Sequence, residues 1–483
     1  MSTISPFFPK QVTIKPCDMD AHTQILNKWG HRKAFLQHTT VSMRNLFHAW
    51  FHVSRFQFLK RRAKTHAWRV RQLRFQEVIE SATAAALKHD THSLFQIINK
   101  FSPKQPMRRM QLRNQQGQIA SPPEETAMLR HFIQETWKGP KIFDTPDAYI
   151  PDLPFSQADL LHALSQMPAI KAVARPCAPA IVWKSIAPQI APTLYEVLRK
   201  WWIGEQPFIP KWFKDSWMIL IPKPHKPPVH PRALRPLALQ EPLGKSVVGL
   251  LASQAQVALM PIITPWPIWS YLPSRSTQDA LLRVTMHCRD IRKLMIGQRS
   301  TPFTREQKAA RFKIAGGISI FLDIERAFDM VCRPQLFSKL VTLGIPESVA
   351  HLLTQWHQDT CYHLFSQGID EGISVGRGLR QGCKAAPLLW NSYLLLFLQA
   401  LSDRVDRQWI QRCINFYADD GQLGDVFHSA FDFHELLSNL YITLEVLQEF
   451  GMTINSSKCT ALVAMTIANC DNPSQLFARE KNG

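Results

Sequence analysis

The chain has 483 residues, of which 45% are hydrophobic, so it is long enough for more than one domain and can bury a large core. Its 57 Lys and Arg residues exceed its 37 Asp and Glu residues, and the net charge of +20 favours an anionic partner such as nucleic acid. The nine cysteines have no Cys-x-x-Cys spacing and the N-terminus has no apolar signal core, which argues against a disulfide framework, a zinc knuckle and secretion.

The N-terminal part of the chain carries most of the positive charge. Residues 1–120 contain 20 Lys and Arg against 5 Asp and Glu, which accounts for +15 of the net +20. The stretch from Lys60 to Leu87 combines basic residues and alanines without Gly or Pro, so it predicts a helix. We expect residues 1–150 to form a basic, mainly helical extension that binds nucleic acid. A solvated charged helix face and an anionic membrane surface are the alternatives.

A loop-like stretch rich in Pro and Asp, residues 140–154, predicts the end of this extension. Beyond it, Ser156 and Asp159 have the spacing of a capping box, which predicts the start of a helix. A further helix is expected over residues 181–202, and residues 217–221 predict a short strand. The chain then becomes basic and polar, and we expect residues 291–316 to form an insertion or linker.

A short apolar run, Ile318 to Leu322, predicts a buried strand after the breaker Gly316-Gly317. Asp323 follows where this strand should end. A carboxylate in that position can face a second acidic turn on a neighbouring strand, so Asp323 is a candidate metal ligand.

The acidic turn lies about 95 residues downstream, in Phe416-Tyr417-Ala418-Asp419-Asp420. Two adjacent carboxylates repel each other and raise each other's proton affinity unless a cation intervenes. Taken alone, Asp419-Asp420 is more simply interpreted as a solvated acidic turn. Together with Asp323, the pair predicts a three-carboxylate site for two divalent metal ions, which catalyse in-line displacement at phosphorus.

These two segments resemble motifs A and C of reverse transcriptases. Other segments resemble further motifs of that family in the expected order, from the finger motifs to motif D: Ile221-Pro222-Lys223-Pro224, Leu234-Arg235-Pro236-Leu237 with Lys245, Tyr271 to Leu281, Arg380-Gln381-Gly382-Cys383 with residues 387–391, and Gly451 to Lys458. The segment Tyr271 to Leu281 is similar to one found in non-LTR (LINE-type) retroelement enzymes. The resemblance covers about residues 150–470, and by it the chain is identified as a reverse transcriptase of that type.

The resemblance implies a two-metal centre. Asp323, Asp419 and Asp420 would bind two Mg²⁺ ions, for which Mn²⁺ can substitute, and Ile324 is included among the metal-binding residues. Lys458 would protonate the leaving pyrophosphate. The alternative for Lys458 is a solvated lysine at the edge of a strand.

The resemblance also implies residues that bind the incoming nucleotide. Arg235 and Lys223 would contact the triphosphate. Phe328 would be the steric gate that excludes a ribose 2′-hydroxyl, with ordinary core packing as the alternative. Gln381 and Gly382 belong to the loop that faces the template and the nucleotide.

The expected fold is an α+β right-hand polymerase. Residues 151–290 would form the fingers and residues 317–470 the palm, with a tail over residues 471–483. The palm would be an antiparallel sheet of the motif A strand, the motif C hairpin and the motif D strand, backed by helices near residues 333–343, 388–401 and 433–450. Only about 20 residues follow motif D, so we expect the thumb to be missing or incomplete.

The leading hypothesis is an RNA-directed DNA polymerase that uses an RNA template, a DNA primer and deoxynucleoside triphosphates, in the nucleus or cytoplasm. By the same resemblance, the basic N-terminal extension would help to hold the template RNA. The longest apolar run, residues 387–401, is too short to span a bilayer, so no membrane partner is expected. A non-catalytic nucleic-acid-binding remnant and a group II intron-type maturase are the alternatives. The oligomeric state is left open.

Overall fold

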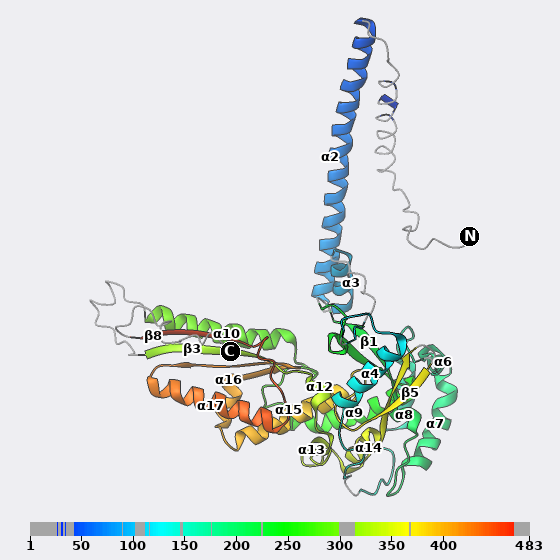
Figure 1. Ribbon diagram of the computed structural model, residues 1–483, viewed down its shortest axis with the longest axis vertical. Helices are drawn as coiled ribbons and strands as arrows, with labels where there is room; N and C mark the ends of the chain where they lie inside the picture. Colours follow the sequence, from blue (N-terminus) through cyan, green and yellow to red (C-terminus); the bar gives the residue numbers. More distant parts are fainter. Residues whose placement is uncertain are drawn as a thin grey trace. The chain divides into compact units, whose positions relative to one another are not determined.

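The computed structural model in Figure 1 describes residues 27, 30, 31, 34, 43–88, 90–101, 112–114, 116–144, 148–174, 176–223, 226–298, 314–366 and 369–467. Two compact units divide the chain, Met1–Met107 and Arg108–Gly483. The compact second unit therefore begins well before residue 150, where the basic extension was expected to end. The expected tail over residues 471–483 lies outside the described residues.

The first unit contains two described helices, α2 (Met43–Leu87) and α3 (Thr91–Phe101). The helix predicted from Lys60 to Leu87 is confirmed and is the second half of α2. An Asp90 carboxylate oxygen accepts the Ser93 N–H at 3.0 Å, which satisfies a donor at the start of α3.

The second unit is a mixed α+β structure that contains two four-stranded sheets. The first sheet has the order β2-β1-β4-β5, in which β1 pairs with β4 in parallel and the other neighbours are antiparallel. Its strands are β1 (Ser216–Pro222), β2 (Leu234–Leu239), β4 (Thr360–Ser366) and β5 (Ile369–Val375). Only β1 among these was predicted; β4 pairs with β1, a segment about 140 residues upstream, and β5 pairs with β4.

Helix α4 shares a core with this sheet, whereas most of the longer helices of this unit pack into the main hydrophobic cluster. Ser156 caps α5 in a capping box with Asp159, as predicted. The single helix expected over residues 181–202 is instead two helices, because the backbone leaves the helical conformation at Ile186 and the next helix begins at Ala187, with Pro188 in its first turn. The bounds of the helices are α4 (Pro122–Thr136), α5 (Gln157–Ser165), α6 (Ala180–Ser185), α7 (Ala187–Trp202), α8 (Lys211–Lys214), η1 (Pro231–Ala233), α9 (Pro242–Ile263), α13 (Arg333–Phe337) and α14 (Glu347–His357).

Helix α9 is long and apolar enough to cross a membrane by length and composition, and no other described helix is. In this fold it is a core helix, because Val247, Leu251, Ala255 and Leu259 are buried in the main hydrophobic cluster. Burial in a protein core explains the same composition without a membrane.

The second sheet has the order β6-β7-β3-β8 and is antiparallel throughout. These are the strands of motifs A, C and D, so the antiparallel sheet that the sequence predicted is present. The strands are β3 (Ile314–Asp323), β6 (Ile414–Tyr417), β7 (Asp420–Phe427) and β8 (Thr460–Ile467). Gly316 and Gly317 do not break the chain but lie inside β3, where a Cβ on Gly317 would collide with Ile291.

Helices cover both faces of the second sheet (Figure 1). On one face Phe416 packs against Phe397 of α15, and Phe427 packs against Phe433 of α17. On the other face lies α10, which the sequence had assigned in part to an insertion over residues 291–316. The helix extends to Gly297 and β3 begins at Ile314, so any insertion is shorter, and residues 299–313 are not described. The bounds are α10 (Thr277–Gly297), α12 (Ala327–Met330), α15 (Ala386–Ser402), α16 (Arg407–Cys413) and α17 (Ala430–Glu449).

Two fully buried arginines connect the loop before α15 to the end of α14. Arg333 donates to the carbonyls of Gly378 at 2.8 Å and His357 at 2.9 Å. Arg380 donates to the carbonyl of Trp356 at 3.2 Å. Because a buried charge is costly unless it is hydrogen-bonded, these contacts fix the loop that follows. The helix expected over residues 333–343 is shorter than predicted and ends at Phe337.

Candidate active site

Three carboxylates meet where strands of the second sheet begin and end. Strand β3 ends at Asp323, whose partner across the sheet is Asp420, the first residue of β7. Asp419 lies in the turn between β6 and β7, and its carbonyl accepts the Ile324 N–H at 3.2 Å. The structure therefore brings the three predicted acids and Ile324 together, although they come from segments about 95 residues apart.

Two helices hold the acidic turn in place. Ala418 has a φ of +56°, a left-handed conformation that is unfavourable for a residue with a Cβ. Its carbonyl accepts a hydrogen bond from Nε1 of the fully buried Trp390 of α15, at 3.0 Å. On the α10 side, the Thr277 hydroxyl donates to the Tyr417 hydroxyl oxygen at 2.7 Å. The position of Asp419 and Asp420 thus depends on both helices.

The site is locally negative. Burial raises the pKa of Asp420, and the neighbouring Asp419 and Asp323 raise it further. Lys458 Nζ donates to both carboxylate oxygens of Asp323, at 2.9 and 2.8 Å, and this hydrogen-bonded pair raises the pKa of Lys458. A single ammonium group thus partly balances three acids.

Beyond the end of β3, the short helix α12 carries two further residues of the site. The Phe328 ring stacks on Trp390 with a centroid distance of 5.3 Å and meets the edge of Tyr271 at 6.3 Å. Asp329 is buried, which raises its pKa to about 6, and Gln381 Nε2 donates to both of its oxygens at 3.2 Å. Phe328 is therefore packed against Trp390, the residue that also holds the acidic turn.

The loop of Gln381 and Gly382 is fixed against β2. Ala238 N–H donates to the Gln381 carbonyl at 2.9 Å. Gly382 has a φ of +122°, and a Cβ at this position would lie 2.6 Å from the Ala238 carbonyl oxygen. Glycine is thus required here by both conformation and space.

Cations gather around Lys223, and two of this group, Lys223 and Arg326, also act on Asp329. The pKa of Lys223 is lowered by burial and, after that, by the neighbouring charges of Lys226, Arg326 and Arg235. Asp329 is the acid that opposes this shift. Several positive charges close to one buried carboxyl group form a site with excess positive charge, which suits a polyanionic ligand.

The arrangement of acids and cations agrees with the result of a comparison with known families. The family model for reverse transcriptase (RNA-dependent DNA polymerase) matches residues 230–475, which is 246 of the 483 residues. The chain belongs to the reverse transcriptase family. The matched range includes Asp323, Phe328, Gln381, Asp419 and Lys458. The sequence prediction of an RNA-directed DNA polymerase is thereby confirmed at the level of the family.

Two solved structures of telomerase from Candida tropicalis are similar to this reverse transcriptase chain. One is in complex with a TWJ fragment of telomeric RNA, and the other is an apo form truncated from the C-terminal domain. Each is 10% identical over 59% of this chain, with a TM-score of 0.37. The matches cover 45% and 56% of the telomerase chains, so this chain spans about half the length of the structures that it matches.

The donor set of the reverse transcriptase site fits a hard divalent cation. Asp323, Asp419 and Asp420 supply oxygen ligands, and the pKa of Asp420 is raised first by burial and then by the two neighbouring acids, whose negative charge a cation would offset. Within the described residues, no three His, Cys, Asp or Glu side chains are arranged as a ready metal cage. Lys458 instead occupies the oxygens of Asp323, so metal binding there requires its ammonium group to move aside.

Three residues that shape the site had no role predicted from the sequence. Trp390 positions the acidic turn and stacks on Phe328, and Thr277 holds Tyr417. Asp329 accepts hydrogen bonds from Gln381 and so holds its side chain. A buried Trp usually finds a partner for its N–H, so Trp390 in an otherwise apolar helix was the available signal.

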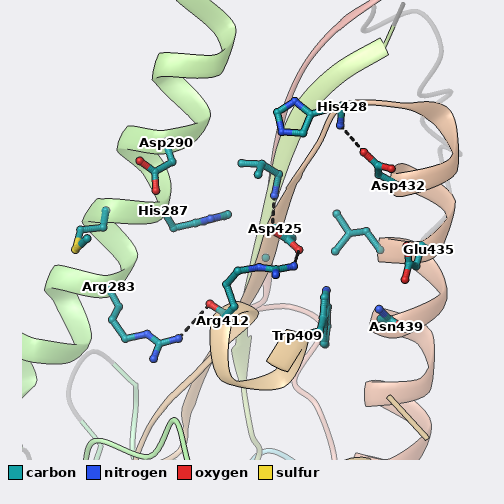
Figure 2. Close-up of a pocket in the computed structure, with 14 residues that line it drawn as sticks. Arg283, His287, Asp290, Trp409, Arg412, Asp425, His428, Asp432, Glu435 and Asn439 are labelled. Atoms are coloured by element: carbon teal, nitrogen blue, oxygen red, sulfur yellow. Dashed lines mark hydrogen bonds and ion pairs between the residues drawn. The ribbon is translucent and has the colours of Figure 1, made fainter. Parts of the chain in front are cut away.

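A cavity lies at the end of β7 away from the three acids, between α10, α16 and α17, and is shown in Figure 2. Its volume is about 510 Å³. Two of the acids there have partners: Asp425 pairs with Arg412 at 2.7 Å, and the Asp432 carboxylate accepts the His428 N–H at 2.9 Å. None of the residues predicted for the active site lines this cavity.

Proposed function

We propose that this chain is the polymerase of a non-LTR retroelement and extends a DNA primer on an RNA template by two-metal nucleotidyl transfer. The observation that supports this most directly is the cluster of Asp323, Asp419 and Asp420 beside a separate cluster of cations. In this assignment the second sheet with α15 and α17 is the palm, and the first sheet with its helices is the fingers.

The reaction joins the primer 3′-oxygen to the α-phosphorus of a deoxynucleoside triphosphate. That O–P bond forms as the bond between the α-phosphorus and the bridging oxygen breaks, pyrophosphate leaves, and the hydroxyl proton passes to solvent. Mg²⁺ bound by the three carboxylates would supply the positive charge that favours the alkoxide and the phosphoryl transition state. Ile324 belongs to this site through its contact with Asp419.

The protein's own groups would position and neutralise the nucleotide. Arg235 and Lys223, with their cationic neighbours, would hold the triphosphate. Phe328, held by its stack on Trp390, would exclude a ribose 2′-hydroxyl. Lys458 would donate a proton to the leaving pyrophosphate after it moves from Asp323.

The type of element rests on the segment Tyr271 to Leu281, which resembles non-LTR enzymes. Arg275 in this segment donates to the Trp266 carbonyl at 2.8 Å, and Ser276 caps α10. The basic first unit would bind the template RNA, because helix α2 carries no acid before Glu77. We place this activity in the nucleus or cytoplasm.

The test is primer extension on an RNA template with Mg²⁺, using the full chain. Asp419→Asn should lower the extension rate at least about a thousandfold, because it removes a ligand that acts on the reacting phosphoryl group. Its affinity for the RNA template should stay close to that of the wild type. Asp425→Asn is the matched control, since Asp425 lies on the same strand at the far end and should leave the rate unchanged.

Two results would replace this proposal. Binding of a preformed hybrid without any extension by the wild type, even with Mn²⁺, would favour a non-catalytic remnant. Stimulation of intron splicing in vitro would favour a maturase. Equal extension rates for Asp419→Asn and the wild type would show that the three acids do not form the catalytic metal site.

A further inference from the structure

Helix α2, a single unbroken helix in Figure 1, carries large aromatic side chains on its surface. Aromatic side chains gathered in solvent mark an interaction site, because each leaves a large apolar area in water. The second unit has concave sites instead, such as the cavity of about 400 Å³ beside Asp323 and Asp420 and the one of about 510 Å³ in Figure 2. Six aromatic side chains of α2 are each at least 48% exposed: Phe47, Trp50, Phe51, Phe58, Trp68 and Phe75.

The six aromatic side chains share one face of α2, which we call the aromatic face. At about 100° per residue, they lie within an arc of roughly 120° around the helix axis. Between residues 59 and 70, the less exposed side chains recur at helical spacing on a face roughly opposite: Leu59, Ala63, His66 and Val70. The aromatic face is thus separate from the face on which α2 is partly buried.

Arginine side chains lie among the rings of the aromatic face. At the same angle per residue, Arg61 and Arg69 fall within its arc. The guanidinium carbons of Arg55 and Arg62 lie 5.4 and 5.8 Å from the centroid of the Phe58 ring. The whole helix has nine Lys and Arg residues, and none of its residues before Glu77 is acidic. A ligand on this face would therefore meet flat apolar rings and positive charges in turn.

This pattern fits single-stranded RNA better than other partners. In a single strand, charged phosphates alternate with bases whose flat faces can stack on aromatic side chains. A duplex keeps those faces in its own stack and is bound mainly through phosphates and 2′-hydroxyls, so it would leave the rings in water. A helix on a membrane surface separates its basic and apolar faces, whereas Arg61 and Arg69 lie among the rings. A second copy of α2 would bring nine further positive charges to this face.

We propose that the aromatic face of α2 binds single-stranded RNA by base stacking, with Phe58 and Trp68 as stacking platforms and the neighbouring arginines on the phosphates. This inference rests on the proposed polymerase function, in which the first unit binds the template RNA, and it specifies that this RNA is unpaired. Phe58 and Trp68 are ten residues apart, or about 15 Å along the helix, so they contact separate bases of one strand.

The test measures the affinity of the full chain for one RNA sequence, either single-stranded or annealed to its complement. A fully paired primer–template hybrid is added first and occupies the polymerase site. Trp68→Ala should raise the Kd for the single strand by about fivefold or more, because it removes a stacking platform. The Kd for the duplex should stay within about twofold of the wild type. Trp68→Phe, which keeps an aromatic ring, should retain most of the affinity for the single strand.

Two control variants on α2 separate stacking from charge and from apolar surface. Leu73 is 63% exposed but is not aromatic and lies outside the aromatic face, so Leu73→Ala should bind both RNAs as the wild type does. Arg69→Gln should weaken the binding of both RNAs to a similar extent, because a phosphate contact does not require an unpaired base. Circular dichroism should show the same helix content in all variants.

A crosslinking measurement makes the test independent of catalysis. A single-stranded RNA with a photoreactive uracil should crosslink to the peptide that contains Trp68 in the wild type and in Leu73→Ala, and not in Trp68→Ala. If the wild type crosslinks there but extends no primer, the assignment of α2 holds and the polymerase proposal fails.

Two other results would overturn the assignment of α2. One is a wild type that extends primers while Trp68→Ala binds single-stranded RNA as the wild type does, or loses affinity for both RNAs equally. The other is a loss of binding to phosphatidylserine vesicles in Trp68→Ala with unchanged binding of single-stranded RNA, which would make a membrane surface the partner of the aromatic face.

Discussion

The two ends of strand β7 differ in how their acidic side chains are paired with cations. At the start of the strand Asp420 lies beside Asp419 and Asp323, with Lys458 as the ammonium partner of Asp323. Nearer its other end, Asp425 accepts hydrogen bonds from Arg412 and from the Val426 N–H. Strand β7 therefore begins at a cluster of neighbouring carboxylates. It ends near Asp425, an acid that is paired with a cation, and we call this the matched end.

The difference indicates which end handles charged ligands. Like charges held together cost free energy that a bound counter-ion can recover, so an unmatched cluster is typical of a site for metal ions or phosphates. An acid that is already paired and hydrogen-bonded gains less from a ligand. Cavity volume alone does not separate the two ends, because the cavity at the matched end is the larger one.

The largest effect that sharpens this comparison is expected at Trp390. Trp390→Phe keeps an aromatic ring against Phe328 but removes the N–H that holds the Ala418 carbonyl. Because a small misplacement of reacting groups can cost about a hundredfold in rate, kcat should fall about 10- to 100-fold. Single-turnover primer extension measures this rate.

The control for Trp390 lies at the matched end. Trp409 is also buried and lines the cavity in Figure 2, and Trp409→Phe should leave kcat within about twofold of the wild type. An unchanged kcat in Trp390→Phe would show that the acidic turn keeps its position without this hydrogen bond.

A smaller effect on stability is expected from the buried Asp329. Its pKa in the folded protein is about 6, above the ordinary value of 3.8. A raised folded pKa gives a stabilising contribution that is complete below the unfolded pKa and is lost as pH rises through the folded value. Above pH 6, Asp329→Asn should therefore have a free energy of unfolding higher than that of the wild type by on the order of 2–3 kcal/mol, and should melt at a higher temperature. Below about pH 4 the variant should melt like the wild type.

Asp432 at the matched end should show the opposite slope. Hydrogen bonds from the His428 backbone and the Ser429 side chain lower its pKa, so its contribution is present above the unfolded pKa and is lost as pH falls. Asp432→Asn should lower the melting temperature near pH 8, and this difference should disappear in acid. Parallel pH profiles for the two variants would contradict the contrast between the two regions.

The residues near the carboxylates could be predicted from the sequence because each lies in a short motif with its own chemistry. Asp323 follows a recognisable strand, and Asp419-Asp420 follows another. Ser156 signalled its helix in the same way, through a local hydrogen bond with Asp159. These predictions needed only neighbours in the sequence.

The features that the sequence did not reveal depend on contacts between distant segments. Gly316 and Gly317 are typical of a loop, but in the fold their missing side chains make room for neighbours of β3. Strand β4 pairs in parallel with β1, and Arg333 is buried by carbonyl partners up to 45 residues away. No local pattern encodes such partners, so α10 over the carboxylate face also went unpredicted.

The smallest effect is expected from the ion pair of Arg412 and Asp425, which is 2.7 Å long. The Arg412 side chain is 65% exposed, so solvent screens the attraction, and a double-mutant cycle should give a coupling of about 0.2–1 kcal/mol. The cycle needs Arg412→Met, Asp425→Asn and the double variant, each melted at two salt concentrations, with primer extension measured in parallel.

Extension rates should be the same in all three variants, and the coupling should weaken at high salt. A coupling above about 2 kcal/mol, or a loss of extension, would mean that the charged groups at this end of β7 influence the acids at its start. A small coupling with full activity would instead tie catalysis to the unmatched end alone. The same strand would then carry a pair that contributes little to stability and an acid cluster that is retained for its chemistry.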